Sequence, residues 1–65
     1  MTIQVIDNIK NTVKTMEVDH DFDLKNYVSV LHPANDFMIY TTGGELNISV
    51  LKDEKIIFIY RSFFN

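Results

Sequence analysis

The acidic segment at residues 17–23, Glu-Val-Asp-His-Asp-Phe-Asp, is the densest group of chemically capable side chains in the sequence. From Asp19 it reproduces the D-x-D-x-D spacing with which a calcium-binding loop begins. The glycine that should follow is Leu24, however, and the twelfth position, which needs a bidentate glutamate, is Val30. The spacing therefore excludes an EF-hand and leaves either a loose cation site or a solvated acidic connector.

A third interpretation of this segment is a charged array that faces another protein. If the segment is extended, its acids alternate and project to one side of the chain. The four carboxylates belong to Glu17, Asp19, Asp21 and Asp23. Such an array would steer association with a basic surface.

Other catalytic or metal-binding arrangements have little support. The chain has no cysteine, and therefore no disulfide framework, thiolate ligand or thiol nucleophile. Its two histidines, His20 and His32, are too few for a typical zinc site, and we expect them at the surface and in a turn. Gly43 and Gly44 join two strand-like runs, whereas a phosphate-binding loop joins a strand to a helix. We expect no enzymatic activity, no metal and no cofactor.

Length and composition favour one small domain over residues 1–65, with 46% hydrophobic and 23% charged residues. A domain of this size is marginally stable alone, which raises the expectation of a partner or a second copy. The net charge of −3 argues against binding to nucleic acid or an anionic membrane. The longest apolar run, Ile56–Tyr60, is far short of the ~20 residues of a membrane helix. Without a signal-peptide pattern, we expect a cytoplasmic protein.

The elements that must position these side chains begin with an amphipathic helix predicted over residues 2–16. Apolar residues there recur at spacings of three and four, from Ile3 through Ile6 and Ile9 to Val13. The alternative is a strand over residues 2–6, followed by a shorter helix that Asp7 caps. Residues 24–31 are similarly ambiguous, because residue types favour a strand over residues 27–31 and spacing favours a helix capped by Asp23. The strand is our preferred interpretation.

The clearest pattern is a hairpin formed by residues 37–42 and 45–51. Two glycines between the runs permit the positive φ angles of a type I′ turn. Counting outward from this turn pairs Thr42 with Glu45, Ile39 with Ile48 and Phe37 with Val50. A second turn at residues 52–55 leads to a strand from about Ile56 to Phe64 that is apolar on both faces.

An even number of loop residues in the second turn places Leu51 opposite Ile56 and puts Phe58 and Tyr60 on the face away from Ile48; an odd number would reverse this. We therefore expect an α+β fold, in which an N-terminal amphipathic helix packs on a small antiparallel sheet with a C-terminal meander. The sheet would have about three or four strands. The uncovered face would then carry Met38, Tyr40, Phe58, Tyr60 and Phe64.

These patterns predict a small, acidic, non-enzymatic protein-binding module. Its aromatic sheet face would anchor a partner and its acidic segment would steer the encounter. Residues with AT-rich codons (Ile, Asn, Lys, Phe and Tyr) number 27, and those with GC-rich codons (Ala, Gly, Pro and Arg) number 5. This bias suggests an inhibitor of a host or defence protein, encoded by a phage or mobile element and acting in the host cytoplasm. The alternative is a homodimer joined through the aromatic face. A second mode of association is strand addition at the final strand, if that strand is an exposed edge, to a second copy or to a partner.

Overall fold

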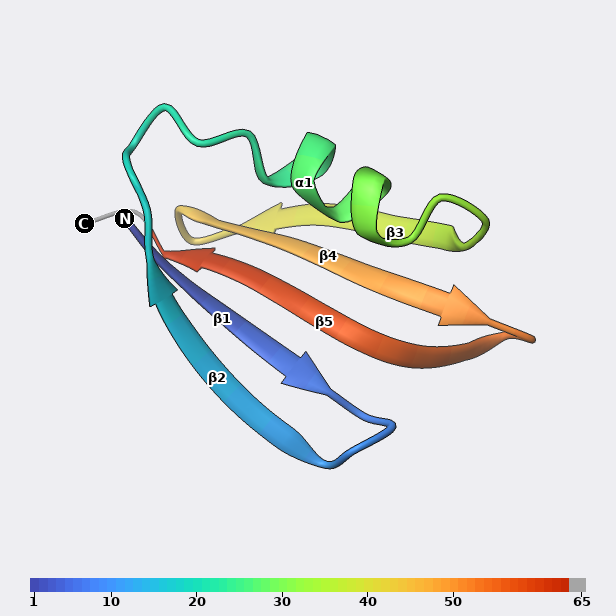
Figure 1. Ribbon diagram of the computed structural model, residues 1–65. Helices are drawn as coiled ribbons and strands as arrows, with labels where there is room; N and C mark the ends of the chain where they lie inside the picture. The colour runs from blue at the N-terminus through green and yellow to red at the C-terminus, as the bar shows by residue number, and fades with distance from the viewer. Residues whose placement is uncertain (64–65) are drawn as a thin grey trace.

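The computed structural model describes residues 1–63 and confirms the α+β class, with one helix packed on a single antiparallel sheet. The sheet has five strands, more than expected, in the order β2-β1-β5-β4-β3 (Figure 1). Along the chain the elements are β1 (Thr2–Asp7), β2 (Thr12–Glu17), α1 (Leu24–Leu31), β3 (Asp36–Thr42), β4 (Glu45–Lys52) and β5 (Lys55–Phe63).

The predicted N-terminal helix over residues 2–16 is wrong, because this segment forms the β1–β2 hairpin. The alternative strand over residues 2–6 was closer, but Asp7 does not begin a helix. Its carboxylate accepts hydrogen bonds from the backbone N–H groups of Ile9 (2.9 Å) and Lys10 (3.0 Å), and Asn11 adopts a positive φ of 56°. These contacts turn the chain back, and the β-branched residues on both sides then favour strands.

The preference for a strand over residues 27–31 is also wrong, because residues 24–31 form α1. Asp23 caps the helix as the alternative expected, and its Oδ1 accepts the backbone N–H of Asn26 at 3.1 Å. Leu24 and Val28 lie one turn apart on the buried face, which packs on the sheet. Tertiary packing of this apolar face thus outweighs the residue-type preference for a strand.

The β3–β4 hairpin has the predicted register, with Thr42 opposite Glu45 and Ile39 opposite Ile48. Gly43 and Gly44 have φ values of 55° and 80°, as a type I′ turn requires. Turn chemistry and the alternation of apolar side chains agree here, which fixes the pairing.

The β4–β5 hairpin contains a β-bulge that the sequence pattern did not predict. Leu51 lies opposite Ile56 as expected, but Val50 lies opposite Phe58, so β5 has one extra residue at this point. Asn8 contacts the bulge, donating its backbone N–H to the Ile57 carbonyl (2.9 Å) and its side-chain amide to the Ile56 carbonyl (3.1 Å). Beyond the bulge the two faces of β5 are exchanged relative to the prediction.

Strand β5 lies in the middle of the sheet between β1 and β4, so the expectation that it forms an edge is wrong. Burial under α1 explains the apolar residues on one face of β5, and its central position leaves Ile59 on the other face only half-buried. The edges are β2 and β3 (Figure 1). The core lies between α1 and the sheet and consists of Ile3, Leu24, Val28, Ile48, Val50 and Tyr60. Within residues 1–63, no helix is long and apolar enough to cross a membrane.

Candidate protein-binding face

The side of the sheet opposite α1 is the surface that the described fold leaves uncovered, and we call it the open face (Figure 1). Strand register assigns its side chains, because residues paired across antiparallel strands point to the same side. Two adjacent rows cross all five strands. The first row is Val13, Ile6, Ile59, Ser49 and Met38; the second is Thr15, Gln4, Arg61, Asn47 and Tyr40.

The first row is mainly apolar and is interrupted by one serine. Val13 and Met38 at its two ends are 61% and 50% exposed, and Ile6 and Ile59 between them are half-buried. Ser49 on β4 is small and almost fully buried, because larger side chains stand on either side of it. Exposed apolar side chains with few charges among them are typical of the centre of a protein–protein interface.

The second row is polar and has one cation, Arg61, at its centre. Arg61 lies on β5 between Gln4 and Asn47, and its Nε is buried without a hydrogen-bond partner among residues 1–63. Tyr40 at the end of the row is 48% exposed. A buried donor of a charged group that lacks an acceptor is costly. Because Nε itself is inaccessible, a carboxylate from another molecule would pair with the other N–H groups of the partly exposed Arg61 guanidinium.

Two of the predicted anchor residues lie on the other side of the sheet. Because of the bulge, Phe58 and Tyr60 pair with Val50 and Ile48 and pack beneath α1, so their predicted placement on the open face is wrong. Tyr60 is only 3% exposed, and burial, with smaller contributions from Tyr27 and Asp7, raises its pKa to about 12. Met38 and Tyr40 do lie on the open face, and Phe64 lies outside the described residues.

His32, expected as a turn residue, follows α1 directly and packs against this aromatic group. Its Nε2 lies 2.8 Å from the Tyr60 hydroxyl oxygen, and its ring centroid is 4.8 Å from that of Phe58. Burial lowers the pKa of His32 below 6.5, since the charged imidazolium loses hydration there. These contacts give His32 a structural role at the end of the helix.

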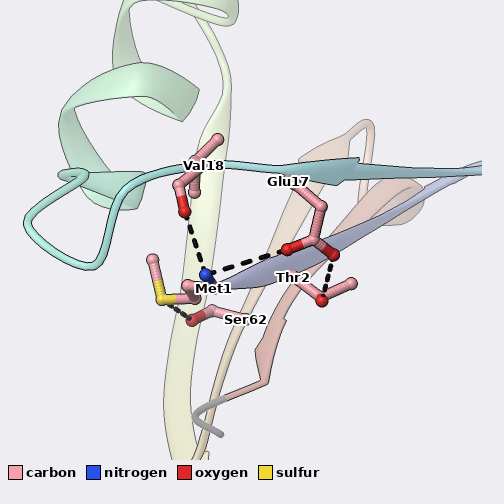
Figure 2. Close-up of polar contacts among 5 residues, drawn as sticks. All are labelled: Met1, Thr2, Glu17, Val18 and Ser62. Carbon is pink, nitrogen blue, oxygen red and sulfur yellow. Dashed lines mark hydrogen bonds and ion pairs between the residues drawn. The ribbon is translucent and has the colours of Figure 1, made fainter.

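The acidic segment does not form the predicted extended array. Glu17 ends β2 and contacts the N-terminus, where its carboxylate lies 3.8 Å from the Met1 ammonium and accepts a hydrogen bond from the Thr2 hydroxyl (Figure 2). The chain then turns, with the Phe22 N–H bonded to the Asp19 carbonyl at 3.0 Å. Asp21 is exposed in this turn.

The fourth acid, Asp23, also has a separate role, because its carboxylate caps α1. The carboxylates therefore do not share one side of a strand. Residues 1–63 contain no group of three His, Asp or Glu side chains arranged to hold a metal ion.

Sequence reasoning missed Val13, Ile6, Ile59 and Arg61 as members of the open face. No alternation marks Val13 and Ile6 in the sequence, because Ile6 directly follows Val5, and both residues also fit a helical spacing. The signal for Ile59 and Arg61 was obscured by the bulge, which reverses the faces of β5. No protein-family model, curated protein or solved structure matches this chain. The function of the protein must therefore be inferred from the geometry of the open face.

Proposed function

We propose that this protein is a non-enzymatic protein-binding module and that the open face is its binding surface. The observation that carries the proposal is the apolar band of Val13, Ile6, Ile59 and Met38 beside the unsatisfied Arg61. Contiguous exposed apolar surface on a small protein typically marks an interaction site. Aromatic, methionine and arginine side chains are enriched in such sites.

The chemistry of the open face specifies the partner. An apolar surface on the partner would cover Met38, Ile59 and Tyr40, and a carboxylate within that surface would pair with Arg61. A planar guanidinium binds a carboxylate through two parallel hydrogen bonds, which fixes orientation as well as adding energy. The exposed Asp19 and Asp21 lie away from this face and would contribute to steering rather than to the contact.

The mode of action that follows is occlusion of the partner's surface, as expected of a small inhibitor or modulator. Origin in a phage or mobile element, antagonism of a host or defence protein and action in the cytoplasm remain predictions from codon bias and composition. The alternative homodimer through an aromatic face loses its main support, because Phe58 and Tyr60 pack beneath α1.

A capture experiment with matched variants tests the proposal. Wild-type protein, Tyr40→Ala and Arg61→Gln would each be immobilised and exposed to lysate of the cells that express the protein. Val30→Ala is the control, because Val30 is an exposed apolar residue on α1, away from the open face. We expect at least one protein to be retained by wild type and Val30→Ala, and lost or reduced with Tyr40→Ala and Arg61→Gln.

Two outcomes would contradict the proposal. Retention of the same proteins in equal amounts by all variants would remove the open face from the binding site. Failure of the wild-type protein to retain any protein specifically would argue against a binding module.

A further inference from the structure

Strand β3 presents an edge that lacks the usual protection against strand pairing. Its sequence, Asp-Phe-Met-Ile-Tyr-Thr-Thr, is regular over seven residues and contains neither proline nor lysine. Six of these residues are exposed, including Met38, Ile39 and Tyr40, and its one charge, Asp36, is at its start. Exposed regular edges of this kind recruit another strand unless charge, proline or a bulge prevents it.

The type I′ turn determines which backbone groups of β3 face outward. Its turn hydrogen bond makes Thr42 and Glu45 a hydrogen-bonded pair, and such pairs alternate along an antiparallel ladder. Tyr40 and Met38 therefore direct their N–H and C=O groups toward β4. Thr41, Ile39 and Phe37 direct theirs away from the sheet. These three residues thus form a row of backbone donors and acceptors along the free edge.

This row is complementary to itself. An antiparallel pair of β3 strands related by a twofold axis through Ile39 aligns Ile39 with Ile39 of the second copy and Phe37 with Thr41. All of these positions direct donors and acceptors toward the partner, as hydrogen-bonded pairs require. Met38 then lies opposite Tyr40 on the open face, in the closer type of pair.

Charge also favours this register. Ile39 is the central residue of β3, so the two Asp36 carboxylates lie at opposite ends of the paired strands, each beside Thr42. On the side of the helix, Ile39 and Phe37 line a shallow groove between β3 and α1, which the second copy's Ile39 would cover.

The opposite edge, β2, differs in its chemistry. Its sequence, Thr-Val-Lys-Thr-Met-Glu, carries two charges in six residues, Lys14 and Glu17. The hydrogen bonds between Met1 and Val18 define its ladder, so that Val13, Thr15 and Glu17 direct their backbone groups outward. Charged side chains of this kind discourage edge pairing.

From these observations we propose that the protein self-associates through β3, in register about Ile39, so that two sheets become one continuous sheet. A closed twofold pair uses the β3 edge of each copy and leaves the two charged β2 edges outside. The open faces of the two copies become neighbours on the same side. This inference does not depend on the proposed foreign partner, because it is argued from the backbone edge of β3, although Met38 and Tyr40 of the open face would lie beside the seam.

Sedimentation equilibrium of the untagged protein, at concentrations up to about 1 mM, tests the proposal. We expect a reversible monomer–dimer equilibrium in the wild type. Ile39→Pro should abolish it, because proline removes an outward N–H that the β3–β4 ladder does not use. Thr15→Pro is the matched control, because its N–H faces outward from the other edge, and it should dimerise as the wild type does. Circular dichroism of both variants checks folding, and Thr41→Pro replaces Ile39→Pro if the latter unfolds.

The register is tested with single cysteines, since the natural chain has none. Under mild oxidation, a mixture of Met38→Cys and Tyr40→Cys should form the mixed disulfide in preference to either symmetric one. Wild-type protein that remains monomeric throughout the concentration range would overturn the proposal. So would a dimer that survives both Ile39→Pro and Thr41→Pro, or a monomer that uses its β3 edge to bind a foreign strand.

Discussion

The imidazole of His32 and the hydroxyl of Tyr60 are joined by a hydrogen bond of 2.8 Å that connects the end of α1 to the middle of the sheet. The two residues are 28 positions apart in sequence. The Phe58 ring packs against the same imidazole, and Tyr27 on α1 packs edge-on against Tyr60. In a sheet covered by one short helix, this contact anchors the C-terminal end of that helix.

The protein should lose stability on acidification through His32. The unfolded chain titrates this group near pH 6.5, whereas burial lowers its pKa in the fold. Below pH 6.5 the unfolded state therefore binds more protons, and the free energy of unfolding falls as the pH falls toward the folded-state pKa. Urea denaturation at about pH 7.5 and about pH 5.5 measures this loss, which His32→Gln should reduce. The exposed His20→Gln is the control, and an equal reduction in that variant would contradict the assignment.

Tyr60 should limit stability at alkaline pH. Its pKa is raised in the fold to about 12 from the ordinary tyrosine value of 10.0, so the unfolded state loses the proton first. The contribution of protonated Tyr60 to the free energy of unfolding is fully present below about pH 10 and is lost as the pH rises toward about 12. Tyr60→Phe should reduce this alkaline loss while lowering stability at neutral pH by about 1 kcal/mol, since His32 loses its partner. Denaturant titrations of this variant and of Tyr40→Phe provide the comparison, and identical alkaline behaviour of Tyr60→Phe and wild type would be the contrary result.

A glycine at position 54 in the β4–β5 turn should stabilise the fold. Glu54 has a φ of 66°, which costs a residue with a side chain about 1 kcal/mol. Glu54→Gly should therefore raise the free energy of unfolding by up to about 1 kcal/mol. Gly44→Ala is the reciprocal test, because its φ is 80° and no atom lies within 4 Å of an added Cβ, so any loss reflects the backbone alone. Thermal or urea unfolding of both variants should show changes of opposite sign, and changes of the same sign would refute the explanation.

The β3–β4 hairpin was predictable because local and tertiary signals coincide in it. The two glycines select the turn, and the turn sets a register that aligns Phe37, Ile39 and their partners on one face. The N-terminal hairpin was not predictable in this way. Ile3, Ile6 and Val13 fit a helical spacing by coincidence, and the turn depends on the Asp7 side chain together with Asn11.

The binding face was harder to predict than the elements, because a single bulge decides it. One extra residue in β5 moves Phe58 and Tyr60 beneath α1 and brings Ile59 and Arg61 to the open face. The bulge carbonyls of Ile56 and Ile57 are bonded by Asn8, which lies far away in sequence. A pattern counted along one strand contains no information about such a contact. Met38 and Tyr40 precede the bulge and were placed correctly.

The most direct test of the central claim is to map the binding surface on this protein by NMR. Amide resonances of the labelled protein would be recorded with and without the partner captured by the wild type. We expect the largest changes at Ile6, Met38, Ile59 and Arg61, and small changes at the exposed positions of α1. If the changes instead centre on Leu24–Leu31, the open face is not the binding surface and the proposed function is wrong.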